Sequence, residues 1–160
     1  MSRKAILSSV FLAAALALSH GTAEADSRGT GLGLIMGEPA GISGRLWLGG
    51  RTALDAALAW STFDEHDGLH LQMDYVWHDF GLLDVDRGAL PVYYGIGGRL
   101  ATREGRHADD RLGVRFPVGL AYLFPSQRAD VFLEVAPTLD LTPDTNVAIE
   151  GGLGIRYFFR

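Results

Sequence analysis

The ten residues Leu69–His78, with the sequence LHLQMDYVWH, alternate between apolar and polar side chains. The odd-numbered positions are all apolar, and only Val76 interrupts the polar row between them. A period of two predicts a β-strand with one apolar and one polar face. A soluble barrel turns its apolar face inward, whereas a membrane barrel turns it outward. The direction of this one face therefore decides the class of protein.

The first residues of the chain have the pattern of an export signal. Arg3 and Lys4 precede the apolar run Ala5–Leu18, and the small residues Ala23–Ala25 follow it. This order is typical of a secretory signal peptide. The run is shorter than the roughly 20 residues of a membrane-spanning helix, which disfavours the alternative of an uncleaved anchor. We predict a cleaved signal peptide at 1–25, export through the Sec pathway, and a single barrel domain at 26–160.

Charge and cysteine content exclude several classes of protein. Without Arg3, Lys4 and Glu24, the 14 basic and 19 acidic residues become 12 and 18, a net charge of −6. This balance disfavours nucleic acid as a partner, because nucleic-acid-binding proteins present a basic surface. The chain has no cysteine, so neither a lipoprotein anchor nor a disulfide is expected. Packing and sheet closure alone must stabilise the exported domain.

Glycine, proline and polar clusters divide the rest of the chain into eight segments. Most of them are longer than the ~5–6 residues of a typical soluble strand. A tilted strand that crosses a membrane needs about 9–11 residues. We predict an all-β fold, an eight-stranded antiparallel up-and-down transmembrane β-barrel, with strands at 29–36, 41–48, 52–60, 69–78, 90–100, 111–124, 129–141 and 147–159.

The two faces of these strands differ in a way that favours a membrane barrel. The apolar rows contain no charged residue, and a charge that faces lipid near the midplane costs about 2–4 kcal/mol. The opposite rows combine glycine and alanine with long polar side chains, which suits a narrow lumen where bare wall leaves room for them. The predicted polar cluster in this lumen is Arg45, Asp55, His70, Asp74, Tyr93, Arg99, Arg115, Glu134, Asp140, Glu150 and Arg156.

Two further features are predicted: salt bridges within this cluster and aromatic girdles at the strand ends. Unpaired buried charges are costly, so we expect salt bridges, with Arg115 and Glu134 as central members. Trp47 shares the parity of Arg45 and is expected to point inward. The other aromatic residues at strand ends lie in the apolar rows, as in the girdles of membrane barrels; they are Trp60, Trp77, Tyr122, Phe124, Tyr157 and Phe159.

With these features the chain resembles the small outer-membrane β-barrels of Gram-negative bacteria, such as the membrane domain of outer membrane protein A. The C-terminal sequence GLGIRYFFR (152–160) is similar to the alternating last strand of such barrels, which ends in an aromatic residue that the assembly machinery reads. Arg160 follows Phe159 and departs from that pattern. The segments 31–48 and 121–145 also resemble a group of short exported bacterial proteins without an assigned function.

Candidate catalytic and metal-binding motifs are weak. The glycines of GTGLGLIMG (29–37) do not have the G-x-G-x-x-G spacing of a dinucleotide site. His70 and Asp74 share a polar face near Ser61, a set of residue types that a hydrolase can use. The acidic stretches 84–88 and 108–111 lack the pattern of an EF-hand loop. We expect no catalytic residue, no metal and no cofactor.

The sequence thus predicts an outer-membrane barrel with a structural or interaction role, no wide pore and no enzymatic turnover. Its expected partners are outer-membrane lipid, lipopolysaccharide and the outer-membrane assembly machinery, and it is expected to be a monomer. Two alternatives stay open. One is an outer-membrane enzyme that hydrolyses lipid or peptide, and the other is a soluble periplasmic lipocalin-like binding barrel.

Overall fold

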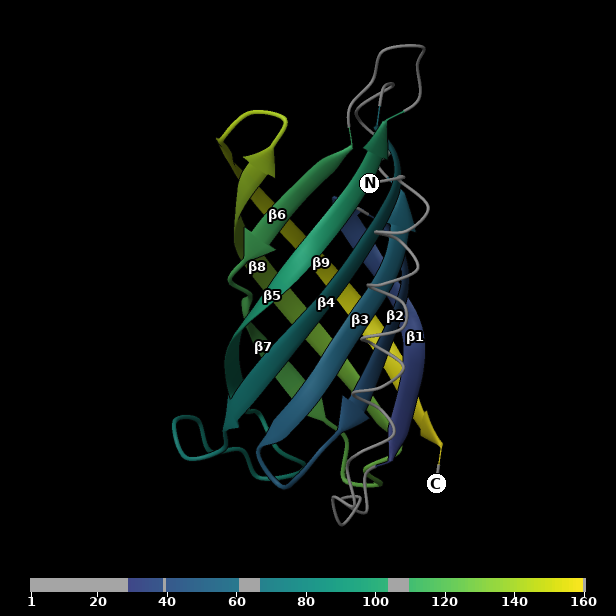
Figure 1. Ribbon diagram of the computed structural model, residues 1–160. Helices are drawn as coiled ribbons and strands as arrows, with labels where there is room; N and C mark the ends of the chain where they lie inside the picture. The colour runs from purple at the N-terminus through teal and green to yellow at the C-terminus, as the bar shows by residue number, and fades with distance from the viewer. Residues whose placement is uncertain (1–28, 39, 61–66, 104–109, 160) are drawn as a thin grey trace.

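The chain folds into one antiparallel sheet that closes into a barrel (Figure 1). The computed structural model describes residues 29–38, 40–60, 67–103 and 110–159. Neighbouring strands pair along the chain, and β1 also pairs with β9, which closes the sheet. The strands are β1 (Thr30–Glu38), β2 (Ala40–Trp47), β3 (Thr52–Trp60), β4 (Asp67–Asp79), β5 (Val92–Arg103), β6 (Arg111–Arg115), β7 (Val118–Leu123), β8 (Ala129–Thr142) and β9 (Asn146–Phe159).

The predicted all-β, antiparallel, up-and-down barrel is confirmed by this pairing. Within the described ranges, no helix is long and apolar enough to span a membrane. The signal peptide predicted at 1–25 lies outside the described residues.

The prediction of one continuous sixth strand at 111–124 is wrong, because the strand breaks at Phe116 and Pro117. Proline has no N–H to donate to a ladder, so it interrupts regular pairing. Two backbone hydrogen bonds cross the break: Phe116 N donates to Pro137 O and Gly95 N donates to Pro117 O, both at 2.9 Å. β6 and β7 pair with the same two neighbours, β5 and β8, so the nine strands fill eight positions around the barrel.

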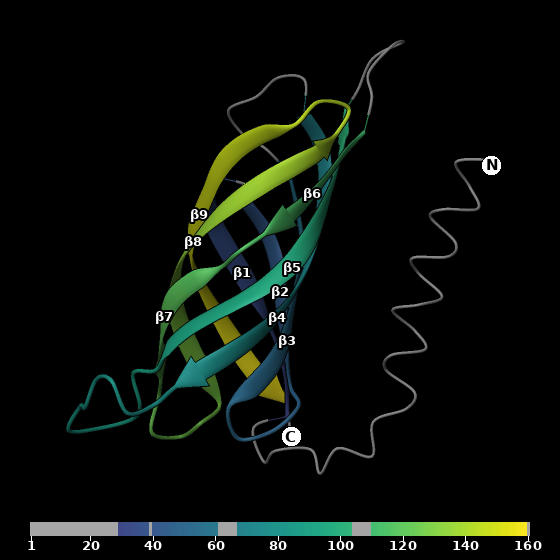
Figure 2. The same ribbon diagram turned by 60° about the vertical axis from the view of Figure 1, so that its left-hand side comes forward.

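The pairing of the first and last strands identifies the two ends of the barrel. Thr30 pairs with Phe159, and we call this end, which carries the C-terminus in Figures 1 and 2, the terminal end. The connections 48–51, 80–91 and 124–128 lie there as well. The β8–β9 turn at 143–145 lies at the other, distal end. The distal connections at 61–66 and 104–109 lie outside the described residues.

The apolar faces of the strands point outward. Along β4, Leu69 is 47% exposed and Trp77 is 39% exposed, whereas Asp74 is 2% and Val76 is 0% exposed. The parity continues across the break before β7, where Phe116 and Val118 are both exposed. Trp60, Trp77, Phe124, Tyr157 and Phe159 are exposed as expected, and Trp47 is buried. The barrel therefore has the reversed amphipathicity that a membrane barrel needs.

Large apolar side chains close the lumen near the terminal end. Trp47, Leu123, Phe132 and Phe158 are buried together with the ring of Tyr93, and we call these five residues the apolar plug. Glycines leave the space for these rings because they have no side chain. A Cβ on Gly154 would collide with the Phe132 ring and come within 2.6 Å of Leu34 O. The narrow lumen thus alternates large side chains with glycine.

Gly154→Val tests this packing. The added side chain must displace the Phe132 ring, and overpacking of this kind lowers the free energy of unfolding by about 1–3 kcal/mol or more. Urea unfolding of the refolded barrel in vesicles measures the effect. The matched control is Gly50→Val, because a Cβ on Gly50 meets no atom within 4 Å. Equal stability of the two variants would contradict a close-packed lumen.

Candidate functional site: the charged lumen

Two groups of ion pairs share the lumen with the apolar plug. The first, which we call the lower cluster, consists of Arg45, Asp55, Asp130 and Arg156. Arg45 donates to both carboxylate oxygens of Asp55 at 2.6 and 2.5 Å. Arg156 donates to both oxygens of Asp130, each at 3.0 Å. Each pair joins residues directly opposite each other, on β2 and β3 and on β8 and β9.

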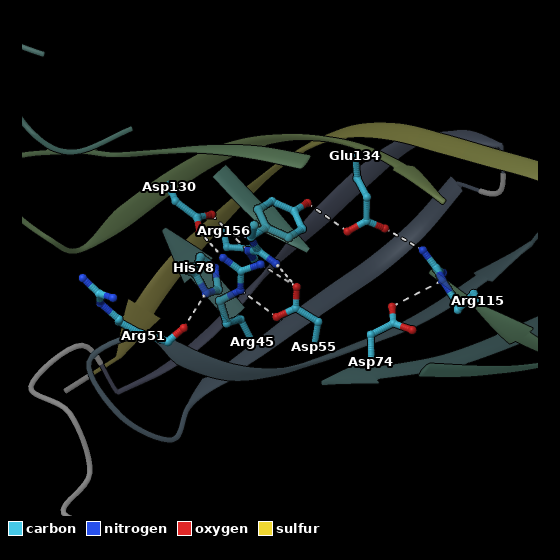
Figure 3. Close-up of polar contacts among 10 residues, drawn as sticks. Arg45, Arg51, Asp55, Asp74, His78, Arg115, Asp130, Glu134 and Arg156 are labelled. Carbon is cyan, nitrogen blue, oxygen red and sulfur yellow. Dashed lines mark hydrogen bonds and ion pairs between the residues drawn. The ribbon is translucent and has the colours of Figure 1, made fainter. Parts of the chain in front are cut away.

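The two pairs of the lower cluster also contact each other across the lumen. Arg45 Nη1 lies 3.6 Å from Asp130 Oδ2, and Arg156 Nη1 lies 3.4 Å from Asp55 Oδ2. Figure 3 shows the four side chains converging from different strands. All four side chains are buried, and their formal charges cancel. This arrangement compensates the desolvation that would otherwise make such burial unfavourable.

The second group, the upper cluster, lies nearer the distal end and has more carboxylates than arginines. It consists of Arg99 and Arg115 with Asp74, Glu134, Asp140 and Glu150, all buried. Arg99 Nη2 is 2.7 Å from Asp140 Oδ2, and Arg99 Nη1 also pairs with Glu150. Arg115 reaches Glu134 at 2.6 Å, Asp74 at 3.3 Å and Glu150 at 3.5 Å. Charge-assisted bonds of this kind are among the stronger hydrogen bonds in proteins.

Tyr93 is the member of the apolar plug that contacts both clusters. Its hydroxyl donates to Glu134 Oε2 at 2.8 Å. The guanidinium carbon of Arg45 lies 5.0 Å from the centre of the Tyr93 ring and 5.6 Å from that of Trp47, within the range of cation–π attraction. Trp47 also packs against His78 at 4.5 Å between ring centres. A continuous set of side chains therefore runs along the barrel axis.

His78 ties this set to the β2–β3 connection at the terminal end. Its backbone N–H donates to Arg51 O at 2.7 Å, and its ring Nδ1 donates to the same oxygen at 3.3 Å (Figure 3). Because the carbonyl can only accept, Nδ1 carries the proton in this contact. The position of the His78 ring is thus fixed by both a hydrogen bond and Trp47.

The structure places every residue of the predicted polar cluster in the interior, and each is at most 7% exposed. Arg115 and Glu134, expected as central members of the cluster, pair with each other within a larger network. Asp130 was not among the predicted residues, although it is fully buried and central to the lower cluster. Its parity on β8, shared with Glu134 and Asp140, was the signal that could have identified it.

The residues considered for chemistry do not assemble into a site within the described part of the chain. Asp74 is bound to Arg115, and His70 is buried on the same face of β4. Ser61 lies outside the described residues, as do 108 and 109 of the second acidic stretch. No group of three or more His, Cys, Asp or Glu side chains in the described ranges could hold a metal ion. What the lumen arrangement does chemically is pair buried arginines with buried carboxylates.

Space inside the barrel is small. A cavity of about 10 Å³ lies among Ile35, Gln72, Arg115, Glu134 and Glu150, which is at the lower limit for one water molecule. Glycines surround the charged groups closely. A Cβ on Gly113 would lie 2.7 Å from Asp140 Oδ1, and one on Gly119 would lie 2.6 Å from the Tyr93 hydroxyl oxygen. The side chains therefore fill the lumen.

Comparison with known proteins supports the fold. No protein-family model matches the chain, and no curated protein matches it in sequence. The N-terminal β-barrel domain of Pseudomonas aeruginosa OprF is similar in structure, with a TM-score of 0.56 and 14% identity over 81% of this chain and 95% of that one. Neisserial surface protein A (NspA) gives a TM-score of 0.48 and 12% identity over 81% and 93% of the two chains. The predicted resemblance to small outer-membrane barrels is confirmed at the level of the fold.

Asp130→Ala tests the lower cluster. The substitution leaves Arg156 without its bidentate partner in a buried site, and breaking a buried pair in this way costs about 3–5 kcal/mol. Urea unfolding in vesicles should show this loss. Asp144→Ala in the exposed β8–β9 turn is the control and should change stability by less than about 0.5 kcal/mol. If the two variants unfold at the same urea concentration, the lumen charges are solvated.

Proposed function

We propose that the protein is an integral outer-membrane barrel of a Gram-negative bacterium, with a structural or interaction role and neither a wide pore nor catalytic turnover. The observation that carries this proposal is the reversed amphipathicity of the strands. Large apolar residues are exposed around the outside, while ten formally charged residues are buried inside. Exposure of these apolar rows to water would be unfavourable, whereas contact with lipid is favourable.

The filled lumen supports a barrel that does not conduct. The apolar plug and the two clusters share the lumen, and the cavity beside the upper cluster is about 10 Å³. Eight positions give a barrel whose interior is only just wide enough for side chains. Transport of solutes through the barrel would require the ion pairs to separate at the cost of unpaired buried charge.

Neither alternative function gains support from the arrangement of side chains. A lipocalin-like binding barrel needs an apolar interior cavity, but here the apolar rows are on the outside. A hydrolase that uses His70 and Asp74 would need the carboxylate to orient the imidazole, whereas Asp74 lies 3.3 Å from Arg115. These observations favour a role carried by the outer surface and by the ends of the barrel.

The partners follow from this surface. We propose that outer-membrane lipid and lipopolysaccharide contact the apolar rows, that the outer-membrane assembly machinery inserts the chain, and that nucleic acid is not a partner. The last described strand, β9, alternates in the manner that the assembly machinery reads. Export through the Sec pathway after cleavage at residue 25 and a monomeric state belong to the same proposal.

Val135→Arg tests membrane residence. Val135 is 48% exposed and lies in the middle of β8, so the arginine would face hydrocarbon. In lipid vesicles its urea-unfolding free energy should fall by about 2–4 kcal/mol. The same substitution at Ser126, in the exposed β7–β8 turn, should have little effect. A soluble periplasmic protein would show a negligible and equal effect at both positions, and fractionation would recover it without detergent.

Permeability measurements test the closed lumen. Vesicles that contain the refolded barrel should release a trapped sugar no faster than vesicles without protein, because the ion pairs and the apolar plug fill the interior. A wide porin reconstituted at the same density is the positive control. Steady sugar release from vesicles with the wild-type barrel would refute a filled interior.

A further inference from the structure

The β4–β5 segment, residues 80–91, exposes an aliphatic pair. Leu82 is 62% exposed and Leu83 is 41% exposed. This segment is the longest described connection, and it lies at the terminal end together with the shorter connections 48–51 and 124–128. A simple turn between two strands needs neither this length nor two exposed leucines. The two exposed leucines therefore favour contact with a molecule outside the barrel.

Both limbs of the β4–β5 segment are fixed to the barrel. At its start, Asp79 Oδ1 accepts a hydrogen bond from Gly81 N at 2.8 Å, and the Phe80 ring lies 6.4 Å from Trp47. On the return limb, Tyr122 Oη donates to Arg87 O at 3.1 Å, and Ala89 bridges to Leu123. In Figures 1 and 2 the segment extends sideways from the foot of the barrel instead of covering its mouth.

Aromatic residues place the β4–β5 segment at the edge of the lipid-facing surface. Trp77 precedes it and Tyr94 follows it, and their exposed rings stack at 6.3 Å with an interplanar angle of 25°. Tyr122, which holds Arg87, belongs to the outward row that includes Leu120 and Phe124. Tryptophan and tyrosine concentrate where hydrocarbon meets headgroups. The segment thus leaves the barrel at the level of this interface.

The order of residues in the β4–β5 segment suits an interfacial position. Leu82 and Leu83 come first, and the exposed charged residues Asp84, Asp86 and Arg87 follow them directly. Leucine gains free energy by leaving water, and charged groups remain with headgroups and water. A protein partner could also cover two leucines, but lipid already borders this surface at Trp77 and Tyr94.

We propose that the β4–β5 segment is a membrane-surface anchor, with Leu82 and Leu83 inserted into the phospholipid leaflet at the terminal end of the barrel. This anchor rests on the proposed membrane location. It adds a lateral contact beyond the strands and fixes the height of the barrel in the bilayer. The partner it fits is the headgroup–acyl boundary of a phospholipid monolayer.

The absence of cysteine from the chain permits a direct test. Leu83→Cys is labelled with an environment-sensitive nitrobenzoxadiazole dye and refolded into vesicles of phosphatidylethanolamine and phosphatidylglycerol. Lipids that carry a spin label at a shallow or a deep acyl position then quench the dye according to its depth. Leu58→Cys on the outer face of β3 is the lipid-facing control. Ser126→Cys in the β7–β8 turn is the aqueous control at the same end.

The anchor predicts that the dye at position 83 emits at shorter wavelength than at 126 and is quenched at least twofold more by the shallow label. The dye at 58 should be quenched by the labelled lipids, because this side chain lies on the outer face of β3. If 83 behaves like 126 while 58 is quenched, the anchor is refuted and the membrane barrel stands. If 58 is not quenched either, the proposed membrane location fails as well. Heat-modifiable gel mobility verifies that all three variants fold.

Discussion

Compensation of buried charge inside a narrow lumen is the constraint on which the rest of the structure depends. Four arginines and six carboxylates lie in the interior, where an isolated charge would be very unfavourable. The four members of the lower cluster pair with one another through bidentate salt bridges and cross-lumen contacts. Such pairs require fixed strand register, because a shift of one residue would turn every charge toward the outside.

The same constraint explains the glycines and the apolar plug. Long side chains can cross a narrow lumen only where the facing wall is bare, and Gly113 and Gly119 supply bare wall beside Asp140 and Tyr93. Toward the terminal end the charges give way to Leu123 and Phe158, whose side chains carry no polar group that needs a partner. Arg156 lies over the Phe132 ring, 3.9 Å from its centre, so the charged and apolar parts are in direct contact.

In the proposed function, contacts with other molecules lie on the surface and at the ends of the barrel. The cavity beside the upper cluster has room for hardly more than one water molecule. The outer face offers apolar rows to lipid, and the β4–β5 segment continues that face sideways with Leu82 and Leu83. A barrel of this kind is suited to hold its ends in place at a membrane. It needs no moving part for that task.

The sequence by itself determined which residues face in and which face out, because side chains alternate strictly along a strand. It therefore predicted the barrel and an interior cluster with Arg115 and Glu134 among its central members. Asp130 followed from the same parity but was overlooked. Only the tertiary structure decided which charges pair across the lumen, since these contacts depend on closure of β1 on β9. It also decided the break at Pro117, where hydrogen bonds to the neighbouring strands continue the sheet. The sideways direction of the β4–β5 segment likewise depends on a tertiary contact, the hydrogen bond from Tyr122 to Arg87 O.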